Sequence, residues 1–233
     1  MATTTVTATR QTFASSGTQT SWNAARNATS ASSFINYTSA TDRADAIEEF
    51  YTSGRGGGSY GVSRVFTFFD LSGISGTITA MDLVIYGVTN ASIEVRPAKS
   101  TAFGGAGDTD FVATDFDNWS PSSPTAYTSA DQAWTINADN TFTLNSTAIT
   151  DANSDGYLNV VSLGSGYDYP NITPGTDITQ QAGVRFQNSS NPLELSITYT
   201  PYIPYDVNSV AGTNINTING VAASLISSIN GVS

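Results

Sequence analysis

The sequence lacks cysteine and histidine throughout its 233 residues. Without cysteine the chain has no disulfide, no thiolate nucleophile and no cysteine-ligated zinc or iron–sulfur site. Without histidine it lacks the most common general base and the most common transition-metal ligand. The side chains that remain for catalysis are carboxylates, tyrosines, arginines and the single lysine, Lys99. We therefore expect a structural or binding protein with no catalytic residues and no cofactor, rather than an enzyme.

Basic residues are also scarce, which excludes two classes of partner. Eight Lys and Arg against 19 Asp and Glu give a net charge of −11, and the basic residues are scattered. Nucleic acids and anionic membrane surfaces both favour clustered basic side chains, so neither is an expected partner. No run approaches the roughly 18 apolar residues of a membrane span. Residues 1–10 lack the basic start and apolar centre of a secretory signal, which favours assembly inside a cell and release on lysis.

The abundant residues favour β-structure. The chain has 11 Phe and 11 Tyr, many Thr and Ser, and only 12% charged residues, as is typical of half-buried strands with neutral polar faces. The strongest strand signal covers residues 63–70. It places Val65 and Phe69 on one face and Phe66 and Phe68 on the other, as expected for a strand buried on both sides.

Weaker patterns complete an all-β fold. Segment 77–87 predicts a strand with its even-numbered residues, from Ile78 to Tyr86, on one face. Further strands are expected at 3–12, 92–97, 157–163, 183–187 and 193–199, with a hairpin over 133–144 that turns at Asp139-Asn140. Short helical turns are expected at 42–51 and 145–152, and a long loop at 103–130. About nine strands predict an antiparallel β-sandwich of the jelly-roll type over residues 1–200.

The composition changes after Pro201, where residues 201–233 form a linker and a repetitive tail. A weak motif of two β-branched residues three apart, followed by Gly, occurs three times. Its last two copies contain Ile215, Ile218, Val221, Ile226, Ile229 and Val232. One copy is too small to bury its own apolar residues, so we expect the tail to drive assembly or attachment. Its Asn, Ser and Gly content leaves a disordered tail as the alternative.

Several segments together resemble one known family. The run Ser63-Arg-Val-Phe-Thr-Phe-Phe-Asp-Leu-Ser-Gly-Ile74, followed by Gly76-Thr-Ile-Thr-Ala-Met-Asp-Leu-Val-Ile-Tyr86, resembles the core of DNRLRE-type domains. The similarity continues at 115–119, 142–148, 151–169 and 191–200, and so covers most of residues 1–200. The usual Asp-rich opening is missing, and the tail lies outside the domain. The resemblance implies a jelly-roll sandwich similar to carbohydrate-binding modules, as found on bacterial surfaces and in phage structural proteins.

The tail resembles C-terminal repeats of structural proteins of marine phages. Together the two resemblances imply a bacteriophage virion surface protein, either a tail fibre or appendage or a capsid decoration protein. We expect a homo-oligomer, a trimer or an array, that contacts other virion proteins and a host surface glycan. A free carbohydrate-binding module or adhesion domain is the alternative, and an enzyme acting on glycosides is a further one.

One segment matches the start of a calcium-binding loop. In Asp151-Ala-Asn-Ser-Asp-Gly-Tyr-Leu-Asn159, oxygen ligands stand at positions 1, 3 and 5 and glycine at position 6. The predicted ligands are Asp151, Asn153 and Asp155. Position 12, which should be a bidentate carboxylate, is Ser162. A structural turn rich in Asn and Asp is the alternative.

Other loop residues are candidates for ligand contact. Trp119, Tyr167 and Tyr169 are expected in or near loops, where aromatic rings can stack on sugars, although burial with the polar atom satisfied is the commoner role. Four acids crowd the 103–130 loop and would either share a calcium ion or remain solvated: Asp108, Asp110, Asp115 and Asp117.

Overall fold

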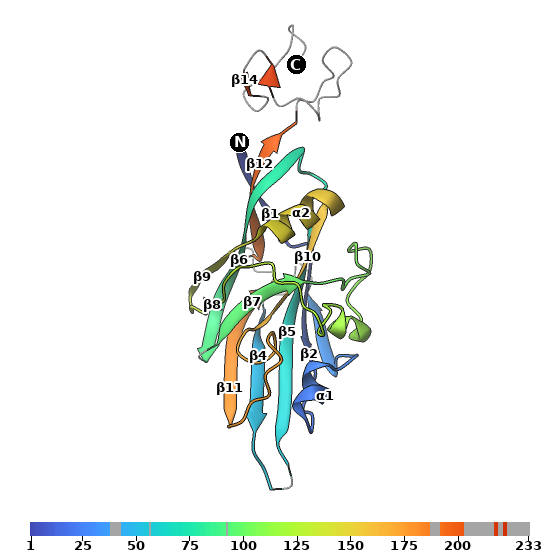
Figure 1. Ribbon diagram of the computed structural model, residues 1–233, viewed down its shortest axis with the longest axis vertical. Coiled ribbons are helices and arrows are strands. Elements are labelled where there is room, and N and C mark those ends of the chain that lie inside the picture. Colours follow the sequence, from blue (N-terminus) through green and yellow to red (C-terminus); the bar gives the residue numbers. More distant parts are fainter. Residues whose placement is uncertain are drawn as a thin grey trace.

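The computed structural model shows an elongated body of antiparallel strands (Figure 1). It describes residues 1–37, 43–55, 57–91, 93–186 and 192–202, together with the backbone of 217–218 and 221–222. The main strands are β1 (Ala2–Thr7), β2 (Arg10–Ser15), β3 (Ser33–Tyr37), β4 (Arg43–Thr52), β5 (Ser59–Asp70), β6 (Gly76–Ala91), β7 (Glu94–Lys99), β8 (Gln132–Ala133), β9 (Ala138–Thr143), β10 (Tyr157–Gly164), β11 (Ile178–Phe186) and β12 (Glu194–Pro201). The helices are α1 (Trp22–Arg26), α2 (Ser146–Asp155) and a 3₁₀ turn, η1 (Ala113–Asp117).

These twelve strands pair antiparallel and belong to one curled sheet. The strand order is β1-β12-β6-β11-β4-β5-β10-β7-β8, with β2 joining β5 to β3 and β9 pairing with β6. The curl places β12 and β6 over β5 and β10. Buried residues of all four strands accordingly share one apolar core. The predicted all-β, jelly-roll-like sandwich is therefore confirmed.

Strand β5 is buried on both faces, as its sequence predicts. Val65 and Phe69 lie in the core between the two layers. Phe66 and Phe68 face the other way, into a second core that the 100–121 loop and α1 cover. The apolar residues on each face of β5 therefore have apolar partners. This second core positions the site described below.

Segment 77–87 is a strand, as predicted, but its even-numbered residues do not all share one face. Met81, Leu83 and Ile85 are buried, whereas the even-numbered positions from 80 to 86 are exposed or half-buried. Ile78 is buried as well, so the alternation shifts by one residue between 78 and 81. The β6–β12 register shifts at the same place, where Thr79 has no opposite residue. A bulge reverses the face of every later residue, and alternation alone does not reveal it.

Three local predictions are also corrected. Segment 42–51 is expected to be a helical turn, but residues 43–51 lie in β4, which pairs with β5 on one side and β11 on the other. Tertiary pairing overrides a short, weak helical pattern. Segment 133–144 is not a hairpin: β8 pairs with β7, β9 pairs with β6, and Asp139-Asn140 lies within β9. The strand expected to stop at Pro97 runs on to Lys99.

Helix α2 replaces the single helical turn expected near 145–152. The Asn145 side chain accepts hydrogen bonds from the backbone N–H groups of Thr147 and Ala148, at 3.0 and 3.1 Å. Gly156 ends the helix in the left-handed conformation, with φ of 73°. An Asn N-cap and a Gly C-cap satisfy the free polar groups at both helix ends.

Both ends of the sandwich lie at one pole of the molecule. Ala2 of β1 pairs with Tyr199 of β12, and the β4–β5 connection forms the opposite pole (Figure 1). Beyond residue 202, β13 (Thr217–Ile218) pairs with β14 (Val221–Ala222). The intervening sequence is Asn219-Gly220, the dipeptide favoured in two-residue hairpins. The other predicted assembly residues, Ile215, Ile226, Ile229 and Val232, lie outside the described residues.

Candidate functional site

A buried charge cluster lies on the outer face of β5. Arg64 donates from Nε to Oδ2 of Asp168 and from Nη2 to Oδ1, both at 2.8 Å, and both residues are 0% exposed. The same guanidinium donates to the carbonyl oxygens of Phe116 and Arg26, at 3.1 and 2.7 Å. This paired geometry satisfies the carboxylate and ties α1 and two loops to the sheet.

Arg26 extends this cluster from α1. Its Nε donates to the Asp168 carbonyl at 2.6 Å and its Nη2 to the Pro121 carbonyl at 2.9 Å. Burial lowers the pKa of Arg26, while Asp168 acts in the opposite direction. Trp119 lies against both guanidinium groups, with its ring centre 4.5 Å from Arg64 and 5.1 Å from Arg26. Two cations thus lie near a single carboxylate and against a single aromatic ring.

Glu49 of β4 completes the cluster. Its Oε1 accepts hydrogen bonds from the backbone N–H groups of Tyr167 and Asp168, while buried Oε2 has no partner among the described residues. Burial raises the pKa of Glu49 to about 7, and the nearby Asp168 carboxylate adds to the effect. An uncharged carboxyl is the form that an apolar, partly satisfied site favours. Because Glu49 is 0% exposed, this cluster organises the fold and offers no surface for a ligand.

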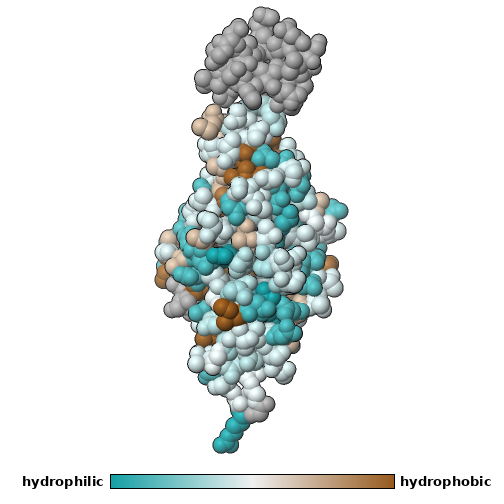
Figure 2. Space-filling view, in the orientation of Figure 1, coloured by the Kyte–Doolittle hydropathy of each residue, from teal (hydrophilic) through white to brown (hydrophobic). Residues whose placement is uncertain are grey.

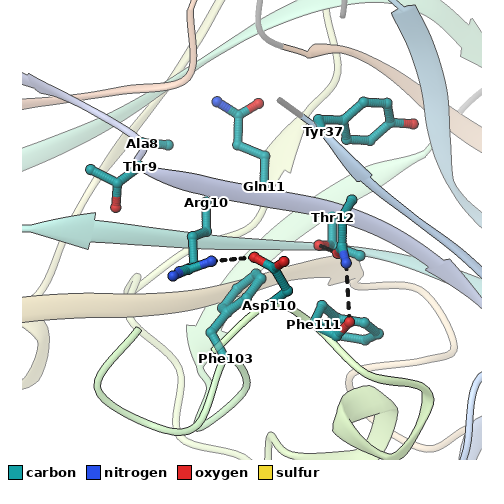
Figure 3. A pocket seen from close by; sticks show the side chains of 10 residues that line it. Ala8, Thr9, Arg10, Gln11, Thr12, Tyr37, Phe103, Asp110 and Phe111 are labelled. Atoms are coloured by element: carbon teal, nitrogen blue, oxygen red, sulfur yellow. Dashed lines mark hydrogen bonds and ion pairs between the residues drawn. The ribbon is translucent and has the colours of Figure 1, made fainter. Parts of the chain in front are cut away.

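An accessible hollow lies beside Arg10, between the 103–111 loop and strands β2 and β3 (Figure 3). We call this hollow and the one on the other side of Arg10 the Arg10 groove. The first hollow encloses about 390 Å³ and is lined by Ala8, Thr9, Arg10, Gln11, Thr12, Asn36, Tyr37, Phe103, Asp110 and Phe111. The second encloses about 620 Å³ and is lined by Thr9, Arg10, Phe68, Asp70, Ser72, Ala106, Gly107, Asp155, Gly156 and Tyr157.

Arg10 connects the two hollows. Its side chain forms an ion pair with Asp110 and donates from Nε to the Gly107 carbonyl at 2.7 Å. Figure 3 shows Arg10, Asp110 and Phe103 on one side of β2, with Gln11 pointing to the other. The Arg10 side chain is 30% exposed and that of Asp110 78% exposed, so a ligand can reach both charges.

The second hollow combines an aromatic wall with acceptors. Phe68 and Tyr157 stack with ring centres 5.3 Å apart. The Ser72 backbone N–H donates to Asp70 at 2.9 Å, and this hydrogen bond lowers the pKa of Asp70. Asp70 is therefore a stable hydrogen-bond acceptor at neutral pH and a poor proton donor. The groove offers charged acceptors, one cation, hydroxyls and ring surfaces, the groups that bind a neutral, hydroxyl-rich ligand.

The predicted calcium ligands lie on a helix rather than in a loop. Asp151 accepts hydrogen bonds from Lys99 Nζ and the Tyr127 hydroxyl, both at 2.8 Å. Asn153 binds the backbone of Ile78, accepting from its N–H at 2.8 Å and donating to its carbonyl at 2.9 Å. Asp155 accepts from the Ser154 hydroxyl and lines the second hollow. Within the described residues, no three acidic side chains lie close enough to hold a metal ion.

The crowded acids of the 103–130 loop also have separate roles. Asp115 is buried and accepts from the backbone N–H groups of Phe103 and Val112, each at 3.2 Å, which closes the loop. Asp110 pairs with Arg10 instead. The sequence patterns do not point to Arg10 as a site residue. The predicted strand over 3–12 is in fact two strands, β1 and β2, and Arg10 begins the second one.

The predicted glycan-contact aromatics are not equivalent in the structure. Trp119 is 2% exposed and packs in the second core, so its ring face is not available to a sugar. The indole instead packs against the guanidinium groups of the two buried arginines. Tyr167 and Tyr169 are half-buried, and Arg96 lies 4.6 Å from the centre of the Tyr169 ring. Neither lines the Arg10 groove.

The surface and the comparisons identify no further site. Figure 2 shows a face that is mostly hydrophilic or intermediate, with small, separate hydrophobic patches. None of the described helices has the length and apolar character needed to cross a membrane. No protein-family model matches the sequence, and no curated protein matches it significantly.

Proposed function

We propose that the chain is a non-catalytic surface protein of a bacteriophage virion that binds a host-surface glycan in the Arg10 groove. The observation that carries the binding proposal is the pairing of an accessible ion pair, Arg10–Asp110, with the half-buried ring of Tyr157, which stacks on buried Phe68. Sugar hydroxyls donate and accept hydrogen bonds, and sugar C–H faces pack on aromatic rings. The groove presents partners for both kinds of contact.

The arrangement of titratable groups supports binding rather than catalysis. Hydrolysis of a glycoside needs one carboxyl with a raised pKa beside an ionised one. The pKa of Asp70 in the groove is lowered, while Glu49, whose pKa is raised, is buried away from it. Asp110 is engaged by Arg10. These features favour recognition without turnover.

The virion assignment rests on the family resemblance of residues 63–86 and of the tail, and it stays a prediction. The position of both sandwich ends at one pole supports a displayed domain, because it leaves the opposite pole unattached (Figure 1). Both a tail appendage and a capsid decoration protein fit this arrangement. Antibodies against the chain should label the surface of purified phage particles; labelling only of disrupted particles would contradict the assignment.

A glycan array probed with the full chain tests the binding proposal. We expect a subset of bacterial surface glycans to bind, and Arg10→Met to abolish that binding while the fold is retained. Arg96→Met is the matched control, since Arg96 also pairs with an aspartate, Asp131, but outside the groove. If Arg96→Met abolishes binding and Arg10→Met does not, the site lies near Tyr169 instead. Absence of binding to any glycan would contradict the proposal.

A further inference from the structure

Strand β1 forms an edge of the sheet. Within the described part of the chain it pairs with β12 alone and ends the strand order. Soluble proteins commonly blunt such edges with charged side chains, prolines or bulges. The sequence of β1, Ala-Thr-Thr-Thr-Val-Thr, contains none of these, and its register with β12 is unbroken. Another edge, β9, carries Asp139, and β8 has only two residues.

The hydrogen-bond pattern identifies the residues that point outward. The Ala8 N–H donates to the carbonyl of Leu193, which is the residue opposite it in the continued register, at 2.9 Å. Opposite residues in an antiparallel pair alternate between bonded and non-bonded. Even-numbered residues of β1 therefore bond to β12. The N–H and C=O groups of Thr3, Thr5 and Thr7 point to the open edge.

We propose that this edge binds a second copy of the same chain, with β1 pairing antiparallel to β1 across a two-fold axis at Thr5. In this register Thr5 faces Thr5 of the second copy, and Thr3 faces Thr7. The outward N–H and C=O groups of each β1 then pair with those of the other copy, forming about six backbone hydrogen bonds. The side chains also match, because Thr3, Thr5 and Thr7 are all exposed on one face of the sheet. On the other face, half-buried Val6 meets Thr4 and extends the apolar core.

Charge favours a second copy at this edge over other places on the molecule. Two chains of net charge −11 repel each other, yet β1 has no charged residue. The nearest acid in the adjacent strand, Glu194, lies opposite Thr7. In the proposed register Thr7 faces Thr3 of the second copy, and that Thr3 lies opposite Thr198 of its own chain. Neither of these residues is acidic. Within β1 and β12, no like charges therefore oppose each other across the junction.

The contact is small, so we expect weak, concentration-dependent association. The inference is independent of glycan binding and of the tail. A clean test uses the absence of cysteine: Thr5→Cys in the full chain places one thiol at the two-fold axis. The two Cα atoms of a hydrogen-bonded pair lie about 5.5 Å apart, within reach of a disulfide. Thr3→Cys is the matched control, because its two copies would be offset by about 14 Å along the strands.

Under mild oxidation we expect Thr5→Cys to form a covalent dimer and Thr3→Cys to remain monomeric. The double variant Thr3→Cys/Thr7→Cys should crosslink again, because those positions face each other. Thr5→Pro tests the same pairing without a thiol, since it removes an outward N–H and no bond to β12. It should abolish the concentration-dependent dimer seen by light scattering. If Thr3→Cys and Thr5→Cys crosslink equally, or if neither does, the proposal is wrong.

Discussion

Arg64 holds both carboxylate oxygens of Asp168 at 2.8 Å, and neither residue is exposed to solvent. The two lie 104 residues apart in the sequence, on β5 and on the loop after β10. Arg26, Glu49 and Trp119 gather around this pair, so one charge pair joins the sheet, α1 and two long loops. The cluster lies between the sheet and the loops that cover this side of the sandwich.

Arg64→Met should strongly destabilise the protein. It leaves Asp168 without its paired donor and frees the Phe116 carbonyl, so we expect a loss of about 3–5 kcal/mol in the free energy of unfolding. Chemical denaturation of the full chain measures this loss. Arg96→Met removes the half-exposed pair with Asp131 and should cost about 1 kcal/mol or less. Equal losses for the two variants would contradict a special role for the buried pair.

Glu49 should make stability depend on pH. Its pKa is about 7 in the folded protein against 4.5 for an unperturbed group, so the folded state binds this proton more tightly. The contribution is fully present below about pH 4.5 and is lost as the pH rises through 7, by up to about 3 kcal/mol. Thermal melts at several pH values should show that Glu49→Gln flattens this dependence. Glu48→Gln, on the same strand, should leave it unchanged; an unaltered profile for Glu49→Gln would refute the assignment.

Asn145 should stabilise α2 through its cap. Asn145→Ala removes the acceptor for two backbone N–H groups and a donor to the Ala126 carbonyl at 2.9 Å. We expect a loss of about 1–2 kcal/mol in the free energy of unfolding. Asn145→Asp keeps the cap acceptor and should recover most of it. A stability equal to that of the wild type for Asn145→Ala would show that packing alone holds the helix.

Calcium should not stabilise the protein through the 151–159 segment. Lys99 and Tyr127 already engage the Asp151 carboxylate, and Asn153 is bound to the backbone of β6. Burial and the bond to Asp151 raise the pKa of Tyr127, which keeps its hydroxyl protonated as the donor. Melting curves with calcium or with a chelator should coincide. A rise in Tm with calcium that Asp151→Asn abolishes would restore the calcium-loop hypothesis.

Sequence patterns predicted the parts of this fold that local chemistry controls. The two-faced aromatic strand 63–70, the loop-rich 103–130 region and the strand 157–163 follow from side-chain alternation and turn residues. The patterns gave wrong predictions where pairing with a distant strand determines the local structure. The bulge at Thr79 exists because β12 pairs on both sides of it, and β4 is a strand because β5 and β11 flank it.

The candidate site was harder to predict than the fold. Arg10 and Asp110 are 100 residues apart, and no spacing rule links them. Trp119 looked like an exposed loop aromatic because the sequence does not show that two buried arginines lie against its ring. Asp151 and Asn153 matched a metal loop in residue type, but the helix that begins at Asn145 gives each of them a different partner.

By itself the sequence determined what the protein lacks and what kind of fold it forms. Without thiols and imidazoles, with few charges and many aromatic and hydroxyl side chains, it specifies a half-buried antiparallel β-structure. Only the tertiary structure decided which carboxylates are buried, which pair with arginine and which strand edge stays open. These properties arise from contacts between residues far apart in the chain, where burial and neighbouring charge, not residue type, set the behaviour of each group.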